Sequence, residues 1–229
     1  MALVLYYHPL ASYCWKALIA LYDSGTAFTP RLIDLGQAED RAALQALWPP
    51  CRFPVLHDAA RGLVLPESSI LIEYLAEHAP GAAPLLPADA QARLDVRLWD
   101  RVCDDHLQHP MQKIVGDRLR DAAQRDPHGV AEARAALQHA YPLFDRQLAG
   151  RTWLASEGFS LADCAALPAL FYASILEPIP AELGALQAYF ERLLLRPAVQ
   201  RVLQEARPWF RFFPFADAMP LRFLASGPS

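Results

Sequence analysis

Ser12 stands where a strand-like run gives way to a helix-like run, a position at which a hydroxyl group can meet an anion. Residues 3–7 (LVLYY) are apolar and favour a strand, and Pro9 ends that strand. After Ser12, apolar residues recur with helical spacing. The unpaired N–H groups and the dipole at a helix N-terminus stabilise a phosphate, a carboxylate or a thiolate. On the local pattern alone, the simpler interpretation is that Ser12 only caps the helix.

Two other groupings of reactive side chains indicate less chemistry. The four cysteines, at positions 14, 51, 103 and 164, stand far apart and form no CxxC pair, so neither a zinc site nor a disulfide framework is expected. His106 and His109 form an HxxH pattern with Asp104 and Asp105 beside it, and such a set could hold a metal. Further ligands of matching spacing are not evident. We therefore expect no metal, and interpret these residues as the polar face of a helix bordering a cleft.

The composition describes a globular chain. Of its 229 residues 54% are hydrophobic, and the formal net charge is -4. The 21 Lys and Arg residues are scattered and offset by 25 Asp and Glu residues, which argues against a nucleic-acid surface. No apolar stretch is long enough to span a bilayer, and the first residues lack the pattern of a secretory signal. We therefore expect a cytoplasmic protein that binds neither nucleic acid nor membrane.

The first third of the chain has the pattern of a small α/β domain. Strands and helices alternate in the order β-α-β-α-β-β-α, which predicts a parallel β-α-β pair joined to an antiparallel hairpin. Pro30 makes its strand an edge strand or the start of one. The expected strands cover 3–7, 27–33, 53–56 and 63–65, and the expected helices 12–24, 40–48 and 67–78.

A proline-rich connector at 80–87 marks a change in composition, and no convincing strand follows it. Pro110 must kink or interrupt a long helical pattern, and residues 121–129 are expected to form a turn. Ser160 and Asp163 form a capping-box-like start to a helix that is apolar nearly all round, hence buried. The aromatic tail at 209–215 is expected to lie back across the body. Further helices are expected at 90–119, 130–148, 164–175, 186–195 and 198–206.

Three short motifs follow one another along this pattern: FPVL at 53–56, ESSI at 67–70 and FSLAD at 159–163. They resemble the x-Pro-x-Leu strand with its cis proline, the Glu/Gln-Ser-x-Ile element and the F-S-x-A-D box of cytosolic glutathione transferases. Residues 15–21 (WKALIAL) resemble the first helix of serine-type members such as the zeta and phi classes. The resemblance covers nearly the whole chain and implies a bacterial, serine-type member. It also implies a thioredoxin-like α/β domain (1–79), a linker (80–87) and an all-α domain (88–229).

The resemblance implies glutathione as the co-substrate and names the residues that hold it. Phe53, which precedes the cis Pro54, would pair through its backbone with the cysteinyl backbone of glutathione. Ser68, at a helix N-terminus, suits the γ-glutamyl carboxylate, and Glu67 suits the ammonium group. Arg52 would reach the glycyl carboxylate, with a solvated arginine as the equal alternative.

The implied reaction activates the thiol of glutathione. A free thiol has a pKa of about 8.5, and lowering it by about two units requires roughly 2.7 kcal/mol of thiolate stabilisation. The position of the first catalytic serine in zeta-like members is occupied by Ala11, while the second survives as Ser12, which we expect to supply the hydroxyl. Tyr13 and Tyr7 are alternatives, and Cys14 would permit a mixed disulfide with glutathione.

The second substrate is expected to be a small apolar electrophile. Leu10, Met111 and Tyr172 are its expected pocket residues, although apolar residues more often belong to a core. The resemblance further implies a homodimer with a role in detoxification. Two alternatives stay open: a glutathione-binding protein without turnover, and an interaction or scaffold module that keeps the fold.

Overall fold

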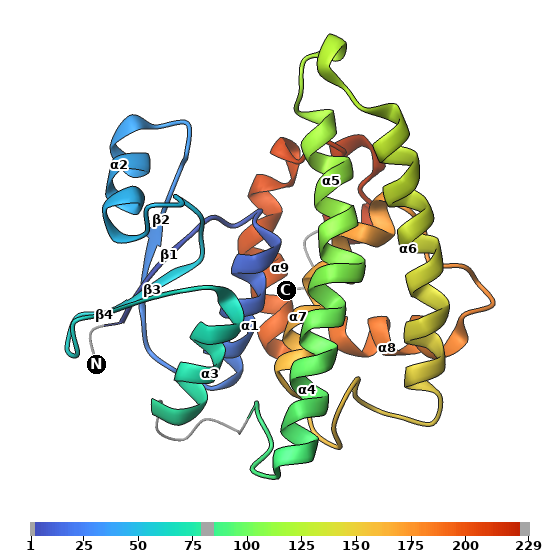
Figure 1. Cartoon of the computed structure of the whole chain (residues 1–229), viewed down its shortest axis with the longest axis horizontal. Coiled ribbons are helices and arrows are strands. Elements are labelled where there is room, and N and C mark those ends of the chain that lie inside the picture. Colours follow the sequence, from blue (N-terminus) through green and yellow to red (C-terminus); the bar gives the residue numbers. More distant parts are fainter. Residues whose placement is uncertain (1–2, 79–84, 225–229) are drawn as a thin grey trace.

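A mixed four-stranded sheet forms the core of the first half of the chain (Figure 1). The computed structural model describes residues 3–78 and 85–224. The strand order is β2-β1-β3-β4, with β1 parallel to β2, and the β1–β3 and β3–β4 pairs antiparallel. This arrangement confirms the expected β-α-β pair joined to a hairpin. The strands are β1 (Leu3–Tyr7), β2 (Thr29–Leu32), β3 (Val55–Asp58) and β4 (Leu63–Pro66).

Helices cover both faces of this sheet. Leu5 and Leu56 oppose one another on the two central strands and are fully buried in the main core. A separate small core joins Leu44 of helix α2 (Ala38–Leu47) to Ile33 and Val55. Strand β2 lies at the edge of the sheet, where a proline is tolerated because no second strand needs its N–H.

Helix α1 (Ser12–Asp23) joins the two halves of the molecule. Every residue from Cys14 to Leu21 is buried, which is expected of a central helix rather than a surface one. The helix packs against α3 (Ser68–His78), and also against α7 (Leu161–Leu176) and α9 (Pro197–Ala206) (Figure 1). A side chain at its first turn therefore lies between the two halves.

The second half consists of helices joined by loops, without a strand among its described residues, which confirms the expected fold class. Helix α6 (Pro127–Leu148) runs beside α5 (His109–Arg118), and the buried α7 lies behind them in Figure 1. The remaining α-helices are α4 (Ala90–Cys103), α8 (Gly184–Leu194) and α10 (Leu221–Leu224). The short helices are η1 (Asp104–Gln108), η2 (Ala122–Gln124), η3 (Arg207–Phe212) and η4 (Ala216–Ala218).

Pro110 interrupts the long helical pattern in a specific way. The segment η1 between α4 and α5 is π-helical, and Pro110 follows it in the first turn of α5. A proline in an α-helix would clash with the carbonyl four residues earlier and would remove one hydrogen bond. The wider π turn leaves room for Pro110, so α4, η1 and α5 form one column in Figure 1.

The predicted turn at 121–129 is partly wrong, because α6 begins at Pro127. The side chain of Asp126 caps this helix by accepting a hydrogen bond from the Gly129 N–H at 2.8 Å. Proline is favourable at this position, since the missing N–H would have had no partner inside the helix. The Asp-Pro pair therefore starts a helix where we had expected a turn.

Two further expectations for the second half, the capping box and the docked aromatic tail, are confirmed. Asp163 accepts a hydrogen bond from the Ser160 N–H at 2.8 Å in the capping box at the start of α7. The tail lies back on the body, because the Phe210 ring packs 6.2 Å from the Trp15 ring. The Phe213 ring lies 5.1 Å from Tyr172.

The proposed domain limits fall beside residues outside the described part. Helix α3 ends at His78 and α4 begins at Ala90. Most of the predicted linker at 80–87 is not described, so the limits 1–79 and 88–229 remain a proposal. Among the described helices, none is both long and apolar enough to cross a bilayer.

Candidate functional site

A polar pocket of about 350 Å³ lies between the first half of the chain and the column of α4 and η1. Its wall contains a carboxylate and a guanidinium group from each side and hydroxyls from the first half, so it suits a small ligand that carries several charges. We call it the polar pocket. Its lining residues are Tyr13, Trp48, Arg52, Phe53, Pro54, Glu67, Ser68, Ser69, Ile70, Arg101 and Asp104.

A second pocket of about 610 Å³ adjoins it. Tyr13, Arg52 and Phe53 line both pockets, and Ser12 lines only the second. Most of its side chains are aliphatic or aromatic, and we call it the apolar pocket. Its other lining residues are Leu10, Ala11, Leu35, Cys51, Met111, Gln112, Val115, Gly116, Leu119, Tyr172, Phe212, Phe213 and Pro214.

Ser12 is the first residue of α1, and its interpretation as a cap is wrong. Ala11 holds the N-cap position, and the Ser12 side chain makes no capping hydrogen bond because it lies one residue inside the helix. The hydroxyl instead accepts a hydrogen bond from Nε2 of Gln108, and Nε2 of Gln112 lies 3.5 Å away. Among the described residues, no acceptor receives the Ser12 hydroxyl proton.

The three alternatives to Ser12 occupy different positions. Tyr13 lines both pockets, and burial together with Asp104 raises the pKa of its phenol, which makes it a poorer proton donor. Tyr7 and Cys14 line neither pocket. Cys14 is fully buried, and that burial raises the pKa of its thiol far above the usual range. Of the alternatives, only Tyr13 is positioned to contact a ligand.

Phe53 lies at the boundary of the two pockets. The Phe53–Pro54 peptide bond is cis, as in the family strand that the sequence resembles. The Phe53 ring stacks on the imidazole of His8 at 6.1 Å, and His8 meets the edge of Trp209 at 5.0 Å. Burial lowers the pKa of His8, and its Nδ1 accepts a hydrogen bond from the Leu10 N–H at 3.2 Å. The loop before α1 is therefore fixed against the residue that precedes the cis proline.

The N-terminus of α3 forms the floor of the polar pocket. Glu67 has a φ of 67°, and its carbonyl accepts the first helical hydrogen bond, from Leu71 N–H at 2.9 Å. A left-handed conformation is costly for a residue with a side chain, and such strain is often found at ligand sites. Ser68 follows, is buried, and its hydroxyl has no hydrogen-bond partner among the described residues. A ligand carboxylate at this helix start would meet that hydroxyl and free N–H groups.

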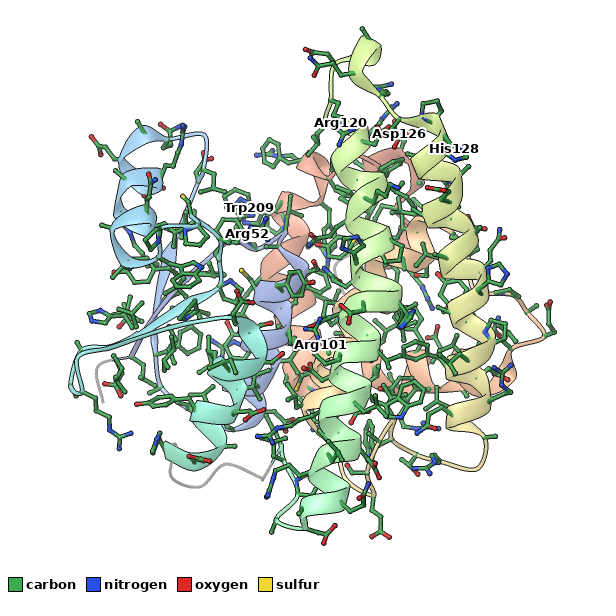
Figure 2. All side chains as sticks on the ribbon, in the orientation of Figure 1. Arg52, Arg101, Arg120, Asp126, His128 and Trp209 are labelled. Carbon is green, nitrogen blue, oxygen red and sulfur yellow. The ribbon has the colours of Figure 1, made fainter. Side chains whose placement is uncertain are left out.

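Two arginines approach the polar pocket from opposite sides, and both are labelled in Figure 2. Arg52 comes from the loop before β3 and is exposed. Arg101 comes from α4 and forms ion pairs with Asp104 at 3.2 Å and Asp105 at 2.6 Å. Arg52 makes no ion pair within the described residues, so its charge remains available to a ligand anion.

A buried ion network lies behind the polar pocket. Lys16 of α1 is only 1% exposed, and its Nζ lies 2.5 Å from Asp100 and 3.1 Å from Asp104. Ser69 completes the network, because it accepts from Lys16 and donates to Asp100, both at 2.8 Å. Burial lowers the pKa of Lys16, but the two carboxylates raise it by more, so the net shift is upward. Lys16 therefore stays charged and joins α1 and α3 to the helical half.

The three residues expected to contact an electrophile line the same apolar pocket. Leu10 precedes α1, Met111 lies in α5 and Tyr172 lies in α7. The Tyr172 hydroxyl donates to the Leu10 carbonyl at 2.9 Å, so its ring faces the pocket while its polar end is satisfied. Three segments that are distant in sequence meet here.

Sequence reasoning missed several residues in or beside these pockets. Asp104 and Gln108 lie in the segment that was interpreted only as a polar helix face, and Arg101 was not singled out at all. The π turn directs Gln108 and Asp104 inward, and neither the spacing of apolar residues nor a motif signals this rotation. Within the described residues, no group of three or more His, Cys, Asp or Glu side chains is arranged to hold a metal ion.

The fold and the pockets define a class of protein in which a thioredoxin-like domain precedes a helical domain. The family model described as "Glutathione S-transferase, N-terminal domain" matches residues 5–83, and the one described as "Glutathione S-transferase, C-terminal domain" matches residues 102–197. Together the two models match more than half of the chain, which belongs to the glutathione S-transferase family.

The sequence identity of the chain to individual relatives is low. The chain is 31% identical over 129 residues to the glutathione S-transferase-like protein LUC7 of Fusarium sp, which covers 56% of this chain and 58% of the relative. It is 29% identical over 170 residues to a stringent starvation protein A homolog of Coxiella burnetii, covering 74% of this chain and 75% of the relative. A glutathione S-transferase structure from Methylobacillus flagellatus, with glutathione bound, matches the fold with a TM-score of 0.80 at 22% identity, covering 88% of this chain and 98% of that one.

Proposed function

We propose that this chain is a glutathione transferase that binds glutathione in the polar pocket and activates its thiol beside Ser12. The observation that carries the proposal is the shared wall of Tyr13, Arg52 and Phe53, with a pocket for charged groups on one side and an apolar pocket on the other. Solved family members with glutathione and glutathione sulfonate bound have the same fold, which supports this choice of ligand.

Each end of glutathione has a complementary group in this arrangement. The Ser68 hydroxyl and the α3 N-terminus suit the γ-glutamyl carboxylate, and Glu67 suits its ammonium group. Arg52 suits the glycyl carboxylate, and the Phe53 backbone suits the cysteinyl backbone. The thiol would then lie toward Ser12 and the start of α1.

The chemistry follows from that position. Donation from the Ser12 hydroxyl and the α1 dipole both favour the thiolate, so the thiol releases its proton to solvent near neutral pH. The sulfur then forms a bond to the electrophilic atom of a small apolar substrate held among Leu10, Met111 and Tyr172. The electron pair of the bond that breaks leaves with the leaving group. In an epoxide it moves to the ring oxygen, and in a conjugated double bond it moves along that bond.

The experiment separates binding from turnover. Calorimetry with glutathione tests the polar pocket, and assays with aryl halides, epoxides, peroxides and maleylacetone-like isomerisation substrates test the reaction. Ser12→Ala is expected to reduce kcat by about a hundredfold or more, since removing one donor that stabilises a developing anion costs about 2.7–4 kcal/mol. Glutathione affinity should change by less than about threefold. Ser24→Ala, at the other end of α1, is the matched control and should leave the rate unchanged; equal rates for both variants would remove Ser12 from the mechanism.

A second candidate is a module that keeps the fold without turnover. The observation that favours this candidate is the 29% identity to a relative named as a stringent starvation protein A homolog. Calorimetry without heat of glutathione binding would support this candidate. Binding without turnover on any electrophile would instead indicate a glutathione-binding protein.

We also propose that the chain forms a homodimer, acts in the cytoplasm in detoxification and is of the serine type, with a zeta- or phi-like first helix. Ile70 of α3 and Leu94 and Leu98 of α4 are exposed apolar residues on neighbouring helices, and a second copy would cover them. An ion pair between Arg97 and Glu73 at 2.5 Å joins these helices. Light scattering would measure the oligomeric state.

A further inference from the structure

Gln108 brings a buried polar side chain from the helical half to the hydroxyl of Ser12. It ends the π-helical segment η1 and is only 2% exposed. Its Nε2 donates to Ser12 Oγ, a contact that joins residues 96 positions apart. Its Oε1 is buried without a hydrogen-bond partner among the described residues. A buried amide with one unsatisfied end has a cost of about 1–3 kcal/mol, so its retention at this site calls for a reason.

The hydrogen-bond capacity of Ser12 supplies that reason. A serine hydroxyl has two acceptor positions and one proton to donate. Gln108 occupies one acceptor position, and Gln112, at 3.5 Å, approaches the same oxygen at the outer limit of a hydrogen bond. Both amides approach the oxygen through their N–H groups, and no described acceptor receives the Ser12 proton. The proton is therefore left for a group in the apolar pocket, which Ser12 lines.

We propose that Gln108 is a positioning residue that holds the Ser12 hydroxyl with its proton directed at the glutathione sulfur. The inference rests on the proposed function of the site. Donation to Oγ polarises the hydroxyl, and chains of hydrogen bonds strengthen one another where water is excluded. The helical half thus lowers the pKa of a thiol that is bound by the other half.

The test compares variants by the ultraviolet absorbance of bound thiolate as a function of pH. Gln108→Leu removes the donor and keeps the size of the side chain, and Gln108→Met is a second variant should the first fold poorly. The pKa of the thiol of bound glutathione is expected to rise by about one unit, because losing the Gln108–Ser12 hydrogen bond costs roughly 1–1.5 kcal/mol. Turnover should fall about tenfold at pH 6.5 and approach that of the wild type near pH 9, with the KM for glutathione within about twofold.

Two controls separate positioning from a structural role. Gln112→Leu, on the next helical turn and farther from Oγ, should shift the thiol pKa by much less. In the Ser12→Ala background, Gln108→Leu should cause no further shift, because the residue acts through Ser12. The other ionisable side chains of the two pockets are the same in every variant: Tyr13, Cys51, Arg52, Glu67, Arg101, Asp104 and Tyr172.

The outcomes are distinguishable. If wild-type protein binds no glutathione or leaves its thiol pKa near 8.5, the proposed function fails. If the wild type lowers the thiol pKa and Gln108→Leu leaves it lowered, the role of Gln108 alone is wrong. A further fall of the pKa in Gln108→Leu would also overturn it, since it would mean that the carboxamide oxygen had taken the Ser12 proton. An equal shift with and without Ser12 would indicate packing rather than positioning.

Discussion

The polar pocket and the apolar pocket share three residues but are assembled in different ways. The polar pocket takes most of its wall from two short segments, 52–54 and 67–70, which are the turns before β3 and at the start of α3. The apolar pocket takes most of its wall from the loop before α1, from α5 and α7, and from the segment 212–214 at the end of η3. One is built by local backbone turns, the other by the packing of distant helices.

Because of this difference, the two pockets should tolerate different substitutions. The hydrogen bonds and ion pairs of the charged and hydroxyl groups in the polar pocket depend on direction, and an ion network fixes the helices behind that pocket. Apolar contacts have little directionality, and their free energy follows the area removed from water. Substitutions should therefore have larger effects in or behind the polar pocket than at the margin of the apolar one.

The largest expected effect is that of Lys16→Met. It leaves Asp100 and Asp104 buried without their cation, and breaking such a pair typically costs about 3–5 kcal/mol of the free energy of unfolding. Urea unfolding measures it. Lys113→Met removes an exposed ion pair with Glu132 at 3.5 Å and should cost less than about 1 kcal/mol. Equal losses of unfolding free energy in the two variants would show that the buried network contributes no more than an exposed ion pair.

The same network makes a prediction for alkaline pH. Because the net pKa shift of Lys16 is upward, its stabilisation is fully present below the unfolded value of about 10.4 and is lost as the pH rises through the folded value. The free energy of unfolding of the wild type should therefore fall above about pH 10 by more than that of Lys16→Met, with up to about 1.4 kcal/mol per pH unit as the difference in slope. Parallel curves would contradict this assignment.

A smaller effect is expected inside the polar pocket. Ser68→Ala removes a hydroxyl placed to meet the γ-glutamyl carboxylate, and a hydrogen bond to a charged group contributes about 1.5–3 kcal/mol. The Kd for glutathione should rise about ten- to a hundredfold, while the KM for an apolar electrophile stays nearly constant. Ser156→Ala removes a hydroxyl that bonds the Gly158 carbonyl outside both pockets and is the matched control. An unchanged Kd in Ser68→Ala would contradict the assigned orientation of glutathione.

The smallest effect belongs to the margin of the apolar pocket. Leu119 is 72% exposed at the end of α5, so Leu119→Ser removes little contact area. The KM for an apolar electrophile should rise about two- to threefold, since less than about 1 kcal/mol is involved, and the Kd for glutathione should not change. Leu195→Ser, at an exposed position outside both pockets, should leave both constants unchanged. A change in glutathione affinity would mean that the two pockets are not separable.

The same contrast explains what could be predicted from the sequence. The β-α-β pair joined to a hairpin and the capping box at Ser160 were indicated by local patterns of strand, turn and capping residues. Phe53, Glu67 and Ser68 were named because the short motifs around them resemble those of the family. Leu10, Met111 and Tyr172 had no motif to support them, because nothing in the spacing of apolar residues distinguishes a pocket wall from a core.

The rest depends on contacts between distant segments. Lys16 stands within a buried apolar run, where an isolated charge signals a partner but does not identify Asp100 and Asp104. Gln108 gave no signal at all, because a glutamine on a polar helix face ordinarily points into solvent. Pro110 was expected to disturb the helix, but the form of the disturbance, a π turn, depends on how α4 and α5 pack.

That π turn determines which stripe of α5 is offered to a second substrate. An α-helix rotates by about 100° per residue, so the wider turn sets the phase of everything that follows it. Deleting one residue of η1 would swing Gln112, Val115 and Leu119 by more than a quarter turn away from their present wall. The deletion of a single residue would thus replace the α5 side chains that face the electrophile, while the residues proposed to bind glutathione would keep their sequence.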